Sequence, residues 1–361
     1  MPAMLKTRVL VVEDSLTIRQ HLVDVMGADP GLEVIGVAED GKRAIELCQT
    51  LRPDVITLDM MLPVMTGLAV TEYVMAYCPT PILIVSASTN RGELFRTYDA
   101  LNAGAVDVLE KPTGMSSDGV WEQKLVAVVK TVARVKVITH LRGKMGLAGR
   151  AVVGPAIVET SNGAAGSRII AIGGSTGGPA AIAQILCGLP QGFPIPILLV
   201  LHIGRPFGAA FAEWLDAQSM LRVRYAKDGE PLPAHGQAGV VMAPPDFHLV
   251  VERGKLSLSS SPERNSCRPS VDVLFESLAR EVGPGTTACL LTGMGKDGAA
   301  GLLTLRRAGA LTYAQDERSS VIFGMPKEAI HIGAAKRVLA LDQIAPELVA
   351  VALEMEVWRK P

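Results

Sequence analysis

The chain has 361 residues, of which 48% are hydrophobic and 20% are charged, and its formal net charge is −1. This composition is typical of globular proteins, and the length allows two domains with a connecting segment. A net charge near zero, without a block of lysines and arginines, argues against a nucleic-acid-binding surface.

The cysteines and the apolar runs indicate the compartment. The five cysteines are scattered and form no C-x-x-C pair, which fits a reducing compartment and argues against a zinc site or a disulfide framework. The apolar runs, such as residues 195–201, are far too short to span a bilayer. No cleavable signal is visible at the N-terminus, so we expect a cytoplasmic protein that does not insert into a membrane.

The first third of the chain alternates short apolar runs with helical patterns. Ile18, Leu22, Val25 and Met26 recur at the spacing of one helix face. Apolar strands that alternate with helices indicate a parallel sheet covered on both sides. The expected strands cover residues 8–14, 34–39, 55–59, 82–87 and 106–111, and a last helix is expected over 121–141.

A second alternating series follows a segment of different composition. Residues 143–166 are dominated by Gly, Ala, Ser and Asn without a clear period, which predicts a linker. Residues 239–260 are predicted to form antiparallel strands that turn at Arg253-Gly254, within a second α/β domain. That domain is expected to have strands at 168–172, 195–201, 287–291 and 310–315, helices at 179–189, 207–215, 271–280 and 298–308, and a strand–helix pair after residue 337.

Acidic side chains end two strands of the first predicted sheet. Glu13 and Asp14 end the first strand, and Asp59 ends the third. Because the carboxyl ends of parallel strands share one edge, these carboxylates would repel one another without a cation, and such oxygen ligands suit Mg²⁺. Ser86 and Lys111 end the last two strands and would hold a phosphoryl group on one carboxylate. A single acid of this kind is more often a solvated loop residue, but five positions at four strand ends favour a site.

Residues 1–125 resemble a response-regulator receiver domain, which has a flavodoxin-like parallel five-stranded sheet. The resemblance implies that Asp59 accepts a phosphoryl group from a histidine kinase. It also implies that Ser86 and Lys111 bind the phosphoryl oxygens, that the Lys111–Pro112 bond is cis, and that Val108 replaces an aromatic switch residue. The Mg²⁺ ligands that it implies are Glu13, Asp14, Asp59 and the backbone carbonyl of Met61. The matching segments are Val-Val-Glu-Asp-Ser at 11–15, Pro-Asp-Val-Ile-Thr-Leu-Asp at 53–59, Pro-Val-Met-Thr-Gly at 63–67, Val-Ser-Ala at 85–87 and Glu-Lys-Pro at 110–112.

The second domain opens with a glycine-rich turn around a serine. Gly173-x-Ser175-x-Gly177 lies between a predicted strand and a predicted helix, which fits a nucleophile elbow. Pro179 suits the first turn of that helix, whose N-terminus offers N–H groups to an oxyanion. Close packing and phosphate binding are the alternatives for such a turn, although a strict G-x-G-x-x-G fingerprint is absent.

A serine nucleophile needs a base and an orienting carboxylate. Of the six histidines, His202 ends the strand after the elbow, so it is favoured over His248 and the others, although a lone histidine is more often structural. Asp297 follows a buried strand and is the favoured carboxylate, with Asp316 as the alternative. The order Ser175, His202, Asp297 differs from that of α/β-hydrolases, so we expect a different fold.

The segment from about residue 168 to 333 resembles the catalytic domain of the chemotaxis protein-glutamate methylesterase family. The resemblance implies a doubly wound α/β domain in which Ser175 is the nucleophile, His202 the base and Asp297 the orienting acid. Thr176 and Met294 would line the pocket and the oxyanion site, and the esterase reaction would need no cofactor. The matching segments are Ala-Ile-Gly-Gly-Ser-Thr-Gly-Gly-Pro at 171–179, Arg-Pro-Ser-Val-Asp-Val-Leu-Phe at 268–275, Leu-Thr-Gly-Met-Gly-Lys-Asp-Gly-Ala at 291–299, and Ala-Gln-Asp-Glu at 314–317 with Val-Ile-Phe-Gly-Met-Pro at 321–326.

Together the two resemblances predict a phosphorylation-activated esterase. Its expected substrates are glutamate methyl esters on methyl-accepting chemotaxis-type receptors, with deamidation of glutamines as a related reaction. The expected domains are a receiver at 1–125, a helical extension and linker at 126–166, and the catalytic domain at 167–357. Leu201, Pro245 and Cys267 depart from the family pattern. The alternatives are an interaction module with an idle hydrolase domain, and the same chemistry on a different protein substrate.

Overall fold

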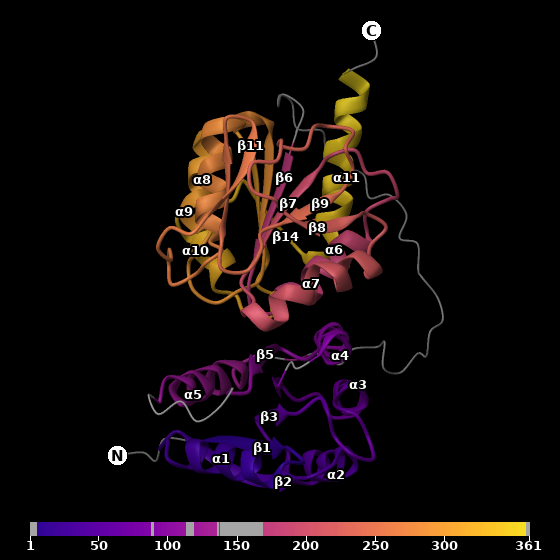
Figure 1. Cartoon of the computed structure of the whole chain (residues 1–361), viewed down its shortest axis with the longest axis vertical. Helices are drawn as coiled ribbons and strands as arrows, with labels where there is room; N and C mark the ends of the chain where they lie inside the picture. The colour runs from indigo at the N-terminus through magenta and orange to yellow at the C-terminus, as the bar shows by residue number, and fades with distance from the viewer. Residues whose placement is uncertain (1–5, 88–89, 113–118, 136, 138–168, 359–361) are drawn as a thin grey trace. The chain divides into compact units, whose positions relative to one another are not determined.

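The computed structural model describes residues 6–87, 90–112, 119–135, 137 and 169–358 (Figure 1). The chain divides into two compact units, Met1–Ala151 and Val152–Pro361. The predicted linker at 143–166 lies outside the described residues, and the domain boundaries expected from the sequence stay a prediction. In the part of the chain that is described, no helix is long and apolar enough to cross a membrane.

The N-terminal unit contains a five-stranded parallel sheet in the order β2-β1-β3-β4-β5. Its strands β3 and β4 are buried along their whole length, as expected when helices cover both faces of a parallel sheet. This architecture confirms the predicted flavodoxin-like fold. The elements are β1 (Thr7–Val12), α1 (Leu16–Gly27), β2 (Leu32–Ala38), α2 (Gly41–Leu51), β3 (Val55–Leu58), α3 (Gly67–Tyr77), β4 (Ile82–Ser86), α4 (Arg91–Asn102), β5 (Asp107–Glu110) and α5 (Val120–Val132).

Two details of this unit differ from the expectations. Helix α5 ends at Val132, not near Leu141, and the chain turns at Ala133 and Arg134. The expected cis bond at Lys111–Pro112 is wrong, since the one cis peptide bond among the described residues is Arg268–Pro269. The trans form is favoured before proline by about 0.5–1 kcal/mol unless the surroundings select the other isomer.

The C-terminal unit contains a seven-stranded sheet in the order β14-β13-β12-β6-β7-β9-β8, and every pair in it is parallel. The doubly wound α/β fold is therefore confirmed. The strands are β6 (Ile169–Gly174), β7 (Ile197–Leu201), β8 (Val223–Tyr225), β9 (Val240–Met242), β12 (Thr286–Leu290), β13 (Leu311–Gln315) and β14 (Arg337–Leu339). The helices are α6 (Gly178–Cys187), α7 (Arg205–Gln218), α8 (Val271–Glu281), α9 (Ala299–Arg307), α10 (Met325–His331) and α11 (Leu341–Trp358).

The antiparallel part of this unit is smaller than predicted. Only β10 (His248–Glu252) and β11 (Lys255–Ser259) form a hairpin, and its two-residue loop is the predicted Arg253-Gly254. Both loop residues have positive φ, which is the conformation that short hairpins prefer. Strand β9, which was expected to be antiparallel, instead pairs in parallel with β7 and β8 in the main sheet.

The strand order places a topological switch point beside β6. The chain passes from β6 to its neighbour β7 on one side, and later returns to β12 on the other side. In doubly wound sheets, ligands bind outside the carboxyl ends of the strands at such a point. Residues that follow β6, β7 and β12 are therefore the ones to examine for a site.

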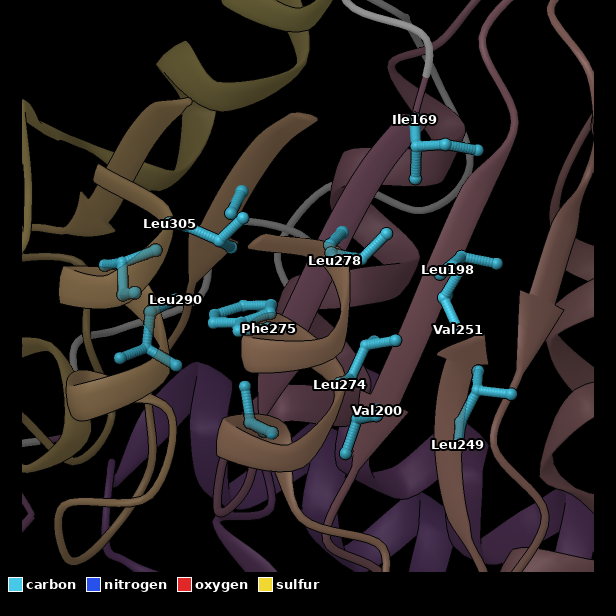
Figure 2. Close-up of a cluster of buried hydrophobic side chains, with 14 of the residues drawn as sticks. Ile169, Leu198, Val200, Leu249, Val251, Leu274, Phe275, Leu278, Leu290 and Leu305 are labelled. Atoms are coloured by element: carbon cyan, nitrogen blue, oxygen red, sulfur yellow. The ribbon is translucent and has the colours of Figure 1, made fainter. Parts of the chain in front are cut away.

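A buried apolar cluster fixes α8 against the sheet. Figure 2 shows Leu274, Phe275 and Leu278 of α8 among side chains from the sheet, the hairpin and α9. Gly301 lets α9 approach, because a Cβ there would lie 2.8 Å from the Phe275 Cβ. This packing sets the position of the first turn of α8, which lies beside the site. Other labelled members of the cluster are Ile169, Leu198, Val200, Leu249, Val251, Leu290 and Leu305.

Candidate active site and phosphoryl-acceptor site

The predicted acid cluster forms at one edge of the N-terminal sheet. Glu13 and Asp59 are buried while Asp14 is exposed, and one carboxylate oxygen of each lies within 4.8 Å of the others. The Lys111 Nζ lies 2.8 Å from Glu13 Oε2 and 3.1 Å from Asp59 Oδ2. Burial, together with the nearby charge of Asp59, raises the pKa of Glu13 although Lys111 acts in the opposite direction. Three hard oxygen donors in this electrostatic setting fit a divalent cation such as Mg²⁺.

The remaining predicted receiver residues surround this cluster. Ser86 is buried at the end of β4, and its carbonyl accepts a hydrogen bond from the Lys111 N–H at 2.9 Å. Met61 lies in the loop between β3 and α3, two residues after Asp59, and its side chain is exposed. The end of this loop requires a glycine at position 67, because a Cβ on Gly67 would lie 2.5 Å from the Asp59 carbonyl oxygen. Val108 lies within β5, at the position expected from the sequence.

The serine elbow forms at the carboxyl end of β6. Ser175 directly follows the strand, and its N–H donates to the Thr292 carbonyl at 3.0 Å. Gly177 has φ +76° and lies just before α6, a conformation that favours glycine. Gly173 allows close packing as well, since a Cβ there would lie 2.3 Å from Val271 Cγ1. The turn therefore combines the elbow and the packing interpretations that the sequence left open.

The predicted base and carboxylate are joined. His202 Nε2 and Asp297 Oδ2 are 2.8 Å apart, and the His202 N–H donates to the Gly174 carbonyl at 3.0 Å. The strand register pairs Gly174 with Leu201, so Ser175 and His202 are the next residues of two neighbouring strands. The structure thus brings together the carboxyl ends of β6, β7 and β12 as expected.

No hydrogen bond between Ser175 Oγ and His202 is present among the described residues. His202 Nδ1, the ring nitrogen not paired with Asp297, instead lies 3.5 Å from Cys267 Sγ. Catalytic hydrogen bonds are often long or misaligned in substrate-free enzymes and tighten when substrate binds. The strand register nevertheless makes Ser175 and His202 neighbours at the ends of β6 and β7.

Asp297 is buried in a ring of donors that the sequence analysis did not assign. Oδ1 accepts hydrogen bonds from Ser270 Oγ at 2.7 Å and from Asn265 Nδ2 at 3.0 Å. Oδ2 accepts one from the Val271 N–H at 2.7 Å. Ser270 is also the N-cap of α8, so the carboxylate lies at the positive end of a helix. The Arg-Pro-Ser-Val-Asp segment at 268–272 was noted in the sequence, but its role needed the fold.

These contacts set the protonation of the pair. Burial acts to raise the pKa of Asp297, but the hydrogen bonds from His202, Ser270 and Asn265 outweigh it and hold that pKa at about 2. Burial acts to lower the pKa of His202, but Asp297 and Cys267 outweigh it and raise that pKa to about 9. The contacts between the two side chains therefore favour the charged form of each.

The competing candidates have structural roles. His248 is buried, and its Nδ1 accepts a hydrogen bond from the Ser270 N–H at 3.1 Å. Asp316 accepts a hydrogen bond from the Ser319 N–H at 2.9 Å within the turn after β13. Both therefore support loops around the site.

The two predicted pocket residues lie in adjoining loops. The carbonyl of Thr176 accepts a hydrogen bond from Thr292 Oγ1 at 3.0 Å. Met294 is exposed, in the loop between β12 and α9. Gly293, next to it, lies so near Ser175 that a Cβ there would be 2.7 Å from the Ser175 Cβ. This loop is thus adjacent to the serine, as an oxyanion loop would be.

Comparison with known proteins shows the family of this chain. Residues 170–348 match the family model described as CheB methylesterase, and residues 9–117 match the response regulator receiver domain. A protein-glutamate methylesterase/protein-glutamine glutaminase of Nitrosospira multiformis is 42% identical over 96% of this chain and 97% of its own length. The chain belongs to the CheB methylesterase family.

A second curated protein and a solved structure are also similar to this chain. A protein of Anaeromyxobacter dehalogenans named protein-glutamate methylesterase/protein-glutamine glutaminase 2 is 43% identical over 93% of this chain and 94% of its own length. The crystal structure of the CheB methylesterase catalytic domain of Thermotoga maritima is 38% identical, covers 52% of this chain and 100% of its own, and has a TM-score of 0.49.

Proposed function

We propose that this CheB-family protein hydrolyses glutamate methyl esters on methyl-accepting receptors and deamidates glutamines, under control of phosphorylation at Asp59. The observation that carries the proposal is the His202–Asp297 pair, 2.8 Å long, at a strand end next to the Ser175 elbow. A hydroxyl, an imidazole and a carboxylate at one switch point support acyl transfer.

The proposed reaction begins with proton transfer. Because Nε2 of His202 pairs with Asp297, Nδ1 is the nitrogen that takes the proton of Ser175. The serine oxygen attacks the γ-carbonyl of the ester, His202 returns the proton to the leaving methoxide, and methanol departs. Water then attacks the acyl-enzyme and leaves a carboxylate. A glutamine substrate follows the same steps and releases ammonia.

Two features contribute to the rate. A positioned general base contributes a factor of about 10²–10⁴. Backbone N–H groups near the start of α6 and in the loop that holds Met294 are the proposed oxyanion donors, and one such donor contributes about 10²–10³. Thr176 is proposed to line the same pocket.

Regulation is assigned to the N-terminal unit. Glu13, Asp14 and Asp59, with the carbonyl of Met61, would hold Mg²⁺, which when bound neutralises negative charge on the phosphoryl group. Lys111, whose Nζ is 3.1 Å from Asp59 Oδ2, is proposed to bind a phosphoryl oxygen, with Ser86 as a second donor. The donor is proposed to be a histidine kinase of the chemotaxis type. A cytoplasmic location stays a prediction.

Release of methanol from methylated receptor is the decisive measurement. The wild-type protein should release methanol, and Ser175→Ala should lower the rate by about 10⁴-fold or more because the nucleophile is removed. Ser261→Ala, which changes an exposed serine after the hairpin, is the matched control and should retain the wild-type rate. Equal rates for Ser175→Ala and the control would overturn the assignment of the nucleophile, and no release by the wild type would overturn the function.

A further inference from the structure

Cys267 lies beside the imidazole of the proposed base and has no part in the proposed reaction. Its Sγ is 3.5 Å from His202 Nδ1 and 3.4 Å from the Asn265 carbonyl oxygen. The side chain is half-buried, so it is accessible from the site. A thiol and an imidazole nitrogen at this separation are two ligands of the kind that Zn²⁺ prefers.

The thiol is held by a rigid turn. Arg264 and Cys267 exchange both backbone hydrogen bonds, at 3.1 and 3.0 Å, and Asn265 and Ser266 between them both have positive φ. The Asn265 side chain donates to Asp297 Oδ1 at 3.0 Å and to Asp272 Oδ2 at 2.9 Å. The turn is thus anchored to the same carboxylate that orients His202, and the sulfur is positioned before any ligand arrives.

The distances fit tetrahedral coordination. Zinc binds sulfur at about 2.3 Å and imidazole nitrogen at about 2.0–2.1 Å, so two ligands at the tetrahedral angle lie about 3.5 Å apart. The observed separation between Cys267 Sγ and His202 Nδ1 is also 3.5 Å. Asp297, on the other ring nitrogen, supplies the carboxylate that commonly orients a metal-binding histidine.

We propose that Cys267 and His202 bind a thiophilic divalent cation of the Zn²⁺ type, which inhibits the esterase reaction. The inhibitory part of this inference rests on the proposed function. Binding releases the thiol proton and the His202 Nδ1 proton to solvent, and the metal occupies the lone pair that this leaves on Nδ1, so this nitrogen cannot accept the proton of Ser175. The sequence argued against a zinc site because no cysteines are closely spaced, but these two ligands are 65 residues apart and meet only in the fold.

Metal binding can be tested without any catalytic readout. Metal-free full-length protein is titrated with Co²⁺, and absorption from thiolate-to-cobalt charge transfer is recorded. The band should appear in the wild type and in Cys187→Ser, which removes an exposed thiol of the same unit. It should be absent from Cys267→Ser and much weaker in His202→Gln. The receiver acids offer only oxygen ligands, so cobalt there gives no such band.

Two outcomes of the titration would overturn the site. One is a wild type without the band, and the other is a Cys267→Ser protein that keeps it. Circular dichroism of each variant shows whether it is folded. If Cys267→Ser does not fold, two measurements still test the site. The band should be much weaker in His202→Gln, and addition of Zn²⁺ to cobalt-loaded wild-type protein should displace cobalt and remove the band.

Inhibition is measured in a separate arm. Zn²⁺ should abolish methanol release by the wild type, and a chelator should restore it. Half-inhibition of Cys267→Ser, measured against its own untreated rate, should need at least about tenfold more Zn²⁺ than half-inhibition of the wild type. This difference corresponds to a loss of about 1.4 kcal/mol of binding free energy. Equal sensitivity of the two proteins would overturn the inhibition. If the metal-free wild type releases no methanol but shows the cobalt band, the proposed function fails while the metal site stands.

Discussion

The carboxylate of Asp297 receives its hydrogen bonds from His202 and from the short segment at residues 265–272. Removing one donor from a buried charge costs more than a neutral hydrogen bond contributes, because the charge is left less well compensated. The low pKa of Asp297 and the high pKa of His202 therefore depend on the same few contacts. Changes at this segment should be visible in the pH dependence of the reaction.

The first prediction concerns the pH profile of the wild type. A base acts only when it is neutral, and the pKa of His202 is raised to about 9, so kcat/KM should rise with pH until about 9. Asp297→Asn removes the charge that stabilises the imidazolium, so it should lower the rate and also move the acidic limb to lower pH. Initial rates of methanol release from pH 6 to 10, with a chelator present, check both. A wild-type limb near 6.5, the ordinary value for histidine, would contradict this.

A second prediction concerns Ser270, whose hydroxyl has two roles. It donates to Asp297 Oδ1 at 2.7 Å and accepts from the Val273 N–H at 3.5 Å as the N-cap of α8. Ser270→Ala should therefore lower the unfolding free energy by about 1–2 kcal/mol and also reduce kcat/KM. Denaturant unfolding and methanol release measure the two effects.

The matched control for this change is another helix cap. Thr66 caps α3 in the N-terminal unit, where its Oγ1 accepts from the Ala69 N–H at 3.3 Å. Thr66→Ala should cost a similar stability of about 1 kcal/mol but leave the unstimulated esterase rate unchanged. A Ser270→Ala protein with wild-type kcat/KM would show that its hydroxyl only caps the helix.

At the scale of the helices and strands, close packing between α8 and α9 positions the site. Gly301 of α9 faces α8, and a Cβ there would lie 2.9 Å from the Asp272 carbonyl oxygen and 2.8 Å from the Phe275 Cβ. The Gly301 N–H also donates to Asp272 Oδ1 at 2.7 Å. An added atom on Gly301 would push α8 and α9 apart. The start of α8 carries the groups that donate to Asp297, and α9 directly follows the loop that contains Asp297.

The third prediction follows from this contact. Gly301→Ala should lower the stability of the C-terminal unit by about 1–3 kcal/mol, even though alanine favours helices, because the packed core cannot accommodate the methyl group. Gly92→Ala in α4 is the control, since its nearest neighbour is a side-chain oxygen at 3.4 Å. Calorimetry should show a lower transition temperature for Gly301→Ala only. A stabilised Gly301→Ala protein would mean that α8 and α9 separate easily.

The alternation of apolar runs and helical patterns was sufficient to predict the first parallel sheet and a second α/β domain, but not the pairing of the shortest elements. Strands β8 and β9 have three residues each, too few for an alternation to show. The predicted antiparallel arrangement of β9 was wrong, since its partners β7 and β8 are decided by tertiary packing. Ser175, His202 and Asp297 were found because each follows a strand. Asn265 and Cys267 were not assigned to the site, since their position depends on a turn with two positive φ angles.

On the scale of the whole molecule, the chain joins two units that each carry a site at the carboxyl edge of a parallel sheet. In one the buried groups are carboxylates and a lysine, and in the other a carboxylate and an imidazole. We propose that the first receives a phosphoryl group and the second an acyl group. Phosphorylation can change esterase activity only if the phosphorylated receiver favours a different state of the chain from the unphosphorylated one. The strength of that coupling is measurable as the ratio of the two rates.

The last prediction tests this coupling. A small phosphodonor with Mg²⁺ should increase methanol release by the wild type, and Asp59→Asn should not respond because it lacks the acceptor oxygen, while its unstimulated rate remains. Asp24→Asn, which changes an exposed aspartate of α1, is the matched control and should respond like the wild type. Removing Mg²⁺ with a chelator should abolish stimulation of the wild type and of Asp24→Asn, because the carboxylates of Glu13 and Asp59 would then repel the incoming phosphoryl group. An Asp59→Asn protein that is still stimulated would place the acceptor elsewhere, and a phosphorylated wild type with an unchanged rate would show that the two units act independently.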